Sequence, residues 1–278
     1  MKKQKHALVL FTKYPEPGLT KTRLMEENGG NLTAQEAADL YRAMCLDTAT
    51  VALSAVERCR NSGNDWGTFT FYISSSPADC MPKIKALFKS EVSTQEIQYI
   101  LDQGRNFDEH FNSCYQQLFE MDYDTVICVG GDLPAITPDL IHRAFSQLFK
   151  LRENSKAGAM VVAPCQAGGV SLVGISKETP IDFTGVFYNQ LGITTLDALV
   201  RIAEGKGIPM AVFEALFDVD YGEDLGHMIS VINAMDYAAR FQEDLLVPKR
   251  TLRWIHETGL VASSPPNEAA DPRSMIDA

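Results

Sequence analysis

Short, almost continuously apolar runs constrain the fold of this chain more than any other feature of its sequence. Residues 7–11, 125–129 and 159–163 contain very few polar side chains. Runs of this length without polar alternation are typical of strands that are buried on both faces of a parallel sheet. Further strands are predicted over residues 68–74, 96–101, 170–175 and 210–213.

Segments with helical spacing of apolar residues alternate with these strands. Thr33 and Glu36 form a predicted capping box ahead of a helix through residues 37–55. Thr137 and Pro138 are typical first residues of another helix. The remaining predicted helices cover residues 81–88, 107–119, 195–204 and 224–241. This alternation predicts an α/β fold with three α/β/α layers and a mostly parallel sheet.

The chain of 278 residues suits one domain, which we expect over residues 1–260. Residues 261–278 are rich in Ser, Pro, Asn, Ala and Asp, and we expect a disordered tail there. No segment approaches the roughly 20 apolar residues of a membrane helix, so no membrane span is predicted. The sequence leaves a homo-oligomer open.

Charge and cysteine spacing narrow the classes of partner and compartment. A formal net charge of −11 argues against nucleic acid or an anionic membrane as the main partner, because both would be repelled. The six cysteines form no CxxC pair and no zinc-type spacing. Reduced thiols in a cytoplasmic protein are therefore expected.

Charged residues gather where the predicted strands end, which is where open α/β sheets bind ligands. Lys13, Lys21 and Arg23 follow the first strand, in a loop that two prolines and a glycine keep irregular. Asp132 follows the central strand, and Asp220 lies beyond the last one. Lys and Arg would contact a di- or triphosphate, and the aspartates would hold Mg²⁺ or Mn²⁺.

Each of these residues also has a purely structural interpretation. The basic loop could be a solvated surface feature, and Asp132 could be an ordinary turn residue. Asp220 and Asp224 could serve as turn and N-cap residues before a helix. His110 has no partner at metal-ligand spacing and could be structural or exposed.

Four segments of this chain carry a resemblance: FTKYPEPGLTKTRL (11–24), VGGDLP (129–134), APCQAGGV (163–170) and FDVDYGEDL (217–225). Together they resemble the motifs of a bacterial family of predicted type-A glycosyltransferases. That family has the nucleotide-diphospho-sugar transferase fold and is related to molybdenum-cofactor and phospholactate guanylyltransferases. The first motif is its opening Lys, Pro, Pro-Gly and Lys-Thr-Arg-Leu pattern, and the second is its Gly-x-Asp-x-Pro turn. The others are similar to its Pro-Ala-x-Asp-Gly-Gly-Tyr segment and its Asp-x-Asp-Thr-x-Glu-Asp-Leu ending.

The resemblance implies roles for individual residues. It implies Asp132 and Asp220 as the metal ligands, and Asp132, Lys21 and Arg23 as the catalytic set. It implies a nucleotide site made by Lys13, Pro17, Gly18, Lys21, Thr22, Arg23 and Asp132. Gly168 and Gly169 would let the backbone approach a substrate closely.

The departures from the family pattern fall on the side expected to bind the acceptor. Ala167 stands where the family has Asp, Val170 where it has Tyr, and His110 where it has Arg. Residues 193–195 replace a Trp-Ser-Thr segment. The acceptor side would be formed by Glu109, His110, Gly168 and Gly169. The pattern therefore predicts a retained nucleotide site beside an altered acceptor site.

The function expected from the sequence is a metal-dependent transferase that uses a nucleotide sugar or an NTP and an unknown acceptor. Glycosyl transfer and guanylyltransferase-like nucleotidyl transfer both remain open. Because Ala167 removes an obvious base, Glu109 or Asp108 would have to replace it in an inverting sugar transfer. The alternatives are a non-catalytic nucleotide-binding protein that has lost its acceptor site, and a structural domain without a ligand.

Overall fold

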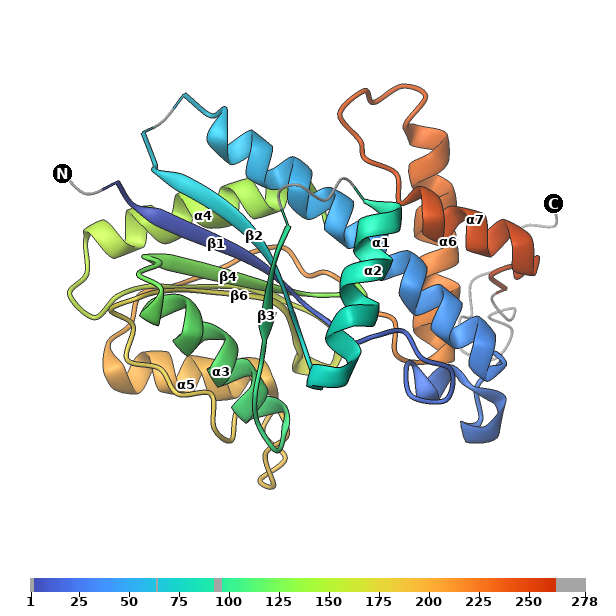
Figure 1. The fold of residues 1–278 in the computed structure, drawn as a ribbon, viewed down its shortest axis with the longest axis horizontal. Coiled ribbons are helices and arrows are strands. Elements are labelled where there is room, and N and C mark those ends of the chain that lie inside the picture. The colour runs from blue at the N-terminus through green and yellow to red at the C-terminus, as the bar shows by residue number, and fades with distance from the viewer. Residues whose placement is uncertain (1–2, 64, 93–96, 264–278) are drawn as a thin grey trace, which may run out of the picture.

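A seven-stranded sheet lies between two layers of helices (Figure 1). The computed structural model describes residues 3–63, 65–92 and 97–263. The strands lie in the order β3-β2-β1-β4-β6-β5-β7. They are β1 Lys5–Phe11, β2 Thr68–Ser75, β3 Ile97–Leu101, β4 Thr125–Gly130, β5 Met160–Pro164, β6 Val170–Ser176 and β7 Met210–Val212. Only β6 runs antiparallel to its neighbours among the described strands, so the predicted mostly parallel α/β/α fold is confirmed.

The helices divide between the two faces of the sheet according to the hydrophobic clusters that they join. Helices α1, α2, α4, α6 and α7 pack into one cluster, whereas α3 and α5 pack into the other. Their bounds are α1 Ala34–Arg60, α2 Met81–Glu91, α3 Phe107–Glu120, α4 Pro138–Glu153, α5 Thr195–Lys206, α6 Gly222–Ala238 and α7 Lys249–Thr258. Among the described residues no helix is long and apolar enough to cross a membrane.

The position of strand β1 in the sheet explains why residues 7–11 are all apolar. Ala7 and Val9 join the cluster under α3 and α5, while Leu8 and Leu10 join the cluster under α1 and α4. All four side chains are fully buried. A strand with helices on both faces must be apolar at every position, because successive side chains point to opposite faces.

Two of the predicted helix starts are confirmed in atomic detail. The Thr33 hydroxyl accepts from the Glu36 N–H, and the Glu36 carboxylate accepts from the Thr33 N–H, which is the predicted capping box. The Thr137 hydroxyl accepts from the Leu140 N–H, with Pro138 as the first residue of α4.

Other boundaries differ from the sequence-based prediction. Helix α6 ends at Ala238 rather than at residue 241, and α7 was not predicted. Residue 96 of the predicted third strand and residues 264–278 of the predicted tail lie outside the described residues. All six cysteines carry free thiols, as expected.

Helix α7 is attached to α1 by one buried carboxylate. Asp47, in the middle of α1, is 4% exposed and accepts from the Thr251 N–H at 2.8 Å and from the Thr251 hydroxyl at 2.9 Å. It also accepts from the Arg250 N–H and pairs with the Arg250 guanidinium at 3.2 Å. The carboxylate thus satisfies N–H groups in the first turn of α7 that have no partner within the helix, and its charge favours that end of the helix dipole.

We expect Asp47→Ala to lower the free energy of unfolding by about 3 kcal/mol, because it leaves buried donors unsatisfied and Arg250 without its partner. Urea denaturation at neutral pH measures this loss. Asp39, exposed on the same helix, provides the control, since Asp39→Ala should change stability by no more than about 0.5 kcal/mol. A loss below about 1 kcal/mol for Asp47→Ala would show that α7 is held mainly by apolar packing.

Candidate functional site

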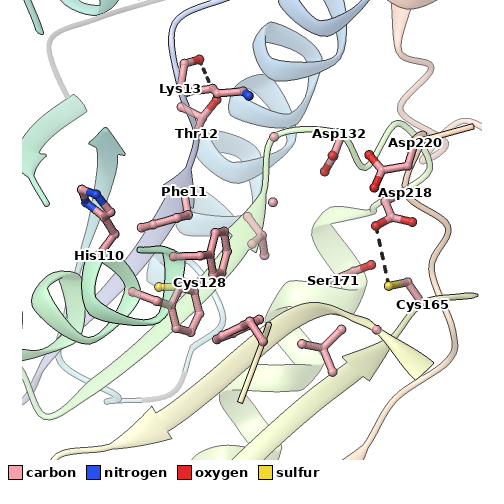
Figure 2. A pocket seen from close by; sticks show the side chains of 18 of the residues that line it. Phe11, Thr12, Lys13, His110, Cys128, Asp132, Cys165, Ser171, Asp218 and Asp220 are labelled. Carbon is pink, nitrogen blue, oxygen red and sulfur yellow. Dashed lines mark hydrogen bonds between the residues drawn. The ribbon is translucent and has the colours of Figure 1, made fainter. Parts of the chain in front are cut away.

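A cavity of about 590 Å³ opens at the carboxyl ends of β1 and β4 (Figure 2). Its wall includes Phe11 at the end of β1, Asp132 after β4 and Asp102 after β3. Asp218 and Asp220, which precede α6, also line it. This is the edge of an open α/β sheet where loops from several strands meet and ligands bind.

Small residues after the central strand are required by close packing. A Cβ atom on Gly131 would lie 2.7 Å from the Cys45 Sγ and 2.9 Å from the Thr12 Oγ1. The Thr12 hydroxyl is itself bonded to the Tyr41 hydroxyl at 2.9 Å and to Cys45 at 3.1 Å. Residue 131 therefore has no space for a side chain, and this fixes the path of the chain that brings Asp132 into the cavity.

Lys21 lies between two carboxylates at the centre of the site. Its ammonium group donates to Asp132 Oδ2 at 2.5 Å and to Asp220 Oδ1 at 2.7 Å. The side chain is only 6% exposed. Although burial disfavours the charged form, the carboxylates of Asp132 and Asp220 raise the pKa of Lys21 above its ordinary value. The Lys21 backbone is left-handed, at φ 50° and ψ 39°, a conformation that is strained for a residue with a side chain.

Two further cations lie beside this pair of carboxylates. The Arg23 guanidinium contacts Asp220 Oδ2 at 3.0 Å and lies 5.0 Å from the centre of the Tyr221 ring. The Lys13 ammonium donates to the backbone carbonyl of Leu19 at 2.7 Å. Burial, followed by the charge of Lys21, lowers the pKa of Lys13. Burial opposes ionisation of Asp220, but Lys21 and Arg23 lower its pKa.

Unlike Asp132 and Asp220, Asp218 forms no ion pair within the described residues, although the charge of Lys21 acts on it. Its Oδ2 accepts a weak hydrogen bond from the Cys165 thiol at 3.7 Å (Figure 2). Burial, together with the negative charges of Asp132 and Asp220, raises the pKa of Asp218 to about 6. Burial likewise raises the pKa of the Cys165 thiol to about 12, so this thiol is not activated as a nucleophile.

The carboxylate cluster fits a hard divalent cation on its donor chemistry. Asp132 and Asp220 already surround one positive charge, the Lys21 ammonium, and Asp218 adds a third carboxylate nearby. Among the described residues, no group of three or more His, Cys, Asp and Glu side chains is placed to hold a metal ion as it stands. Mg²⁺ needs fewer protein ligands than that, because it usually takes one or two carboxylates together with waters and substrate phosphates.

The predicted site residues divide into those that line the cavity and those that do not. Lys13, Lys21, Thr22, Arg23, Asp132, His110, Gly169 and Asp220 line it. Pro17, Gly18, Gly168 and Glu109 do not. Glu109 instead accepts from the Arg105 N–H at 2.9 Å and pairs with its guanidinium at 2.9 Å. Asp108 accepts from the N–H groups of Gly185 and Phe187, so it positions a loop rather than facing the cavity.

The two glycines of the third motif have local packing reasons for their identity. A Cβ atom on Gly168 would lie 2.6 Å from the Thr194 Cβ, and one on Gly169 would lie 2.5 Å from the Cys165 Sγ. Ala167 adopts a left-handed backbone at φ 55° and ψ 25°. Asp and Asn tolerate that conformation better than Ala, so the turn retains a shape that suits a short polar residue.

Sequence reasoning missed Asp102. It directly follows β3, is 3% exposed, and accepts hydrogen bonds from the Ser74 hydroxyl and the His110 ring, both at 2.8 Å. The same sequence pattern that indicates Asp132, a carboxylate shortly after a predicted strand, also applies to Asp102.

Comparisons with known proteins agree with the fold. Residues 75–190 match a family described as "Uncharacterized protein conserved in bacteria (DUF2064)", over less than half of the chain. No curated protein matches the chain. A structure described as a "putative nucleotide-diphospho-sugar transferase from Desulfovibrio desulfuricans G20" is 23% identical, covers 91% of this chain and 95% of that chain, and has a TM-score of 0.69.

Two more distant structures also align. A cytidylyltransferase from Leptospira borgpetersenii serovar Hardjo-bovis (strain JB197) is 9% identical, covers 95% of this chain and 99% of that chain, and has a TM-score of 0.50. Rv0371c from Mycobacterium tuberculosis H37Rv in complex with manganese is 12% identical, covers 82% and 98% of the two chains, and has a TM-score of 0.41. At 23% identity and a TM-score of 0.69, the likeness to the Desulfovibrio desulfuricans structure shows the fold alone, and this nucleotide-diphospho-sugar transferase fold agrees with the sequence-based prediction.

The raised pKa of Asp218 predicts that this residue destabilises the fold at neutral pH. The pKa of Asp218 rises from its ordinary value of 3.8 to about 6 in the folded chain. Between these two pH values the folded state therefore binds a proton that the unfolded state has lost. Stability therefore falls as the pH rises from about 4 to about 6 and stays lowered above that range. We expect Asp218→Asn to raise the free energy of unfolding at pH 7.5 by about 1–2 kcal/mol, a range reduced for the partial solvent exposure of the carboxyl group.

Urea denaturation in EDTA at pH 4, 5.5 and 7.5 measures this gain, which should shrink towards pH 4. Asp220→Asn is the matched comparison and should have the opposite sign. Because the folded-state pKa of Asp220 is lowered, its stabilising contribution is present above its ordinary pKa. An Asp218→Asn variant that is less stable than the parent at pH 7.5 would contradict the expected electrostatic cost of this carboxylate.

Proposed function

We propose that residues 1–260 form a single nucleotide-diphospho-sugar transferase-like domain, and that the protein is a transferase that uses a nucleotide sugar or an NTP with Mg²⁺ or Mn²⁺. The observation that carries this proposal is the position of Lys21 between Asp132 and Asp220, inside a cavity at the strand ends. Three segments far apart in sequence place a buried cation and two carboxylates at one point. Such an arrangement suits binding of a metal ion together with phosphate groups.

The roles follow from charge and position. Lys13, Lys21 and Arg23 would bind the phosphates, with Arg23 able to form paired hydrogen bonds. Asp132 and Asp220 would hold the divalent cation. When bound, such a cation stabilises negative charge on the departing phosphate oxygens. The half-exposed guanidinium of Arg23 and the buried ammonium of Lys21 would stabilise the same negative charge on the departing phosphate.

The bond that is broken distinguishes the two transferase reactions. In glycosyl transfer an acceptor oxygen bonds to the anomeric carbon, and a nucleoside diphosphate leaves. In nucleotidyl transfer the acceptor oxygen bonds to the α-phosphorus, and pyrophosphate leaves. A phosphorylated acceptor would need no base in the second reaction. Since Glu109 is paired with Arg105 and does not line the cavity, the structure gives no support to Glu109 as the base of the first reaction.

A second candidate is a non-catalytic nucleotide-binding protein. Ala167 favours it, because the left-handed turn at this position carries no carboxylate. Both candidates bind nucleotide through the same residues, and only turnover separates them. For either candidate we propose a cytoplasmic protein, on the basis of six free thiols that a reducing compartment would preserve.

The proposal is tested by a thermal-shift screen of the full chain against NTPs and nucleotide sugars, each with Mn²⁺, Mg²⁺ or EDTA. A nucleotide at about 100 times its dissociation constant should stabilise the fold by roughly 2.7 kcal/mol, and EDTA should abolish the shift. Hits are then assayed for release of pyrophosphate or nucleoside diphosphate with sugar phosphates as acceptors. No shift with any nucleotide would overturn the proposal, and binding without turnover would select the non-catalytic candidate.

Asp132→Ala should abolish the metal-dependent part of nucleotide binding and leave the far-ultraviolet circular dichroism spectrum unchanged. The reason is that Asp132 lies in a turn with its side chain 22% exposed, and the buried Lys21 keeps its ion pair with Asp220 when Asp132 is removed. Arg23→Ala should weaken nucleotide binding by about 1.5–3 kcal/mol through loss of charge-assisted hydrogen bonds. Isothermal titration calorimetry measures both effects.

Asp139→Ala is the control for this pair of variants. Asp139 lies at the start of α4 and pairs with Arg58 and Arg143, outside the cavity. Nucleotide affinity should be unchanged in this variant. Equal affinity in the parent, Asp132→Ala and Arg23→Ala proteins would refute the assignment of the site.

A further inference from the structure

His110 lies on the wall of the cavity opposite Asp132, Asp218 and Asp220. Figure 2 shows His110 and Phe11 on one side of the cavity and Asp132, Asp218 and Asp220 on the other. His110 comes from the first turn of α3, and its side chain is 25% exposed. The cavity therefore has a charged end, with the lysines, Arg23 and the aspartates, and an aromatic end that contains His110.

Asp102 fixes the orientation and the tautomer of the His110 ring. The His110 Nδ1 lies 2.8 Å from Asp102 Oδ1, and Asp102 Oδ2 accepts from the Ser74 hydroxyl at 2.8 Å. Because a carboxylate can only accept, we assign the proton in this contact to Nδ1, which then donates the hydrogen bond to Asp102. In the neutral ring Nε2 then has a free lone pair. Within the described part of the chain, Nε2 has no hydrogen-bond partner.

Four aromatic rings line the same cavity as this histidine. The Phe107 ring lies 5.4 Å from that of Phe11, 4.7 Å from that of Phe187 and 5.7 Å from that of Tyr188, measured between centroids. All four rings line the cavity. Phe107 is 36% exposed and Tyr188 is 75% exposed, so both keep surface for a ligand. Asp108 stabilises the loop that carries Phe187 and Tyr188, through the two N–H groups described above.

We propose that the aromatic end binds the nucleobase of the ligand, and that His110 accepts a hydrogen bond at Nε2 from a ring N–H or amino group of that base. Asp102 acts as a positioning residue, because it acts only through His110. This inference rests on the proposed function, which places the phosphates at the charged end. A nucleotide has the matching form, with an anionic tail and a flat head that stacks on aromatic rings.

A base suits this wall better than a sugar does. A hexose presents a hydroxyl group on most of its carbons, and each buried hydroxyl needs a hydrogen-bond partner. Beside the aromatic rings the described lining carries His110, Asp102 and Ser76, and Asp102 and Ser76 both contact the His110 Nδ1, so the groups left for a ligand are the His110 Nε2 and the Tyr188 hydroxyl. A base presents apolar faces and only a few polar groups at its edge, so a single acceptor beside a set of rings can select it.

The test compares ligands with and without a base by isothermal titration calorimetry, in the presence of Mn²⁺. The probes are the four NTPs, inorganic tripolyphosphate and ribose 5-phosphate. His110→Phe keeps the ring and removes the acceptor, and it should weaken binding of the preferred NTP about tenfold. Tripolyphosphate and ribose 5-phosphate should bind the parent and the variant equally. His110→Gln should recover part of the lost affinity, because its amide oxygen can accept at a similar position.

His142→Phe is the matched control. His142 is half-buried against the Trp66 ring and lies outside the cavity, so its replacement should leave NTP affinity unchanged. Because His110→Phe leaves Asp102 buried without its ring partner, the Asp102→Asn/His110→Phe double variant is measured alongside. A single and a double variant with the same loss of NTP affinity would assign the loss to His110 rather than to an unpaired charge.

Asp102→Asn tests the positioning role by a signal that a merely structural residue would not change. In the parent protein, ¹⁵N NMR of the His110 ring should show the Nδ1–H tautomer. In the variant the amide can donate to Nδ1, so the fraction of the Nε2–H tautomer should rise and NTP affinity should fall. An unchanged tautomer with unchanged affinity would overturn the role given to Asp102.

The outcomes separate this inference from the proposed function. If the parent binds no NTP, the proposed function fails. If the parent binds NTP and His110→Phe binds it equally well, only the inference fails. A matching loss of ribose 5-phosphate affinity would identify a sugar hydroxyl as the partner of His110, and a matching loss of tripolyphosphate affinity would indicate a general disturbance of the cavity. Either result also overturns the nucleobase assignment.

Discussion

The ion pairs of Lys21 are the interaction on which the arrangement of the site depends. They join the loop after β1 to the turn after β4 and to the segment before α6, across sequence separations of 111 and 199 residues. Each of these segments is irregular, and the ion pairs of Lys21 connect all three directly. The buried ammonium offsets the repulsion between Asp132 and Asp220, and the left-handed backbone of Lys21 is the local strain that accompanies its position.

The sequence predicted the sheet well because its central strands contain continuous apolar runs, such as residues 7–11 of β1, and it predicted two helix starts because capping is a local interaction. It could not reveal that β6 is antiparallel, since an apolar run carries no information on direction. Helix α7 escaped prediction for a related reason. Its first turn is satisfied by Asp47, about 200 residues earlier in the chain, and no local cap marks its start.

The candidate site was predictable where charge follows a strand and unpredictable where contacts are formed across the fold. Lys13, Lys21, Arg23, Asp132 and Asp220 were found from their position after strands, and they do line one cavity. Asp102 offered the same signal, but its meaning depends on His110, eight residues later on a helix. Glu109, adjacent to His110 in sequence, points to Arg105 instead, because neighbouring helix positions face different directions.

The charge balance of the cavity also explains how a chain with a net charge of −11 could bind a polyphosphate. Three cations, Lys13, Lys21 and Arg23, face three carboxylates, Asp132, Asp218 and Asp220, so the charged end offers little net attraction to an anion by itself. A divalent cation at the carboxylates would compete with Lys21 for their oxygens and free its ammonium for phosphate. By linkage, the metal would then strengthen phosphate binding by the same factor as phosphate strengthens metal binding. On the proposed function, the site is therefore balanced to bind metal and nucleotide together rather than either one alone.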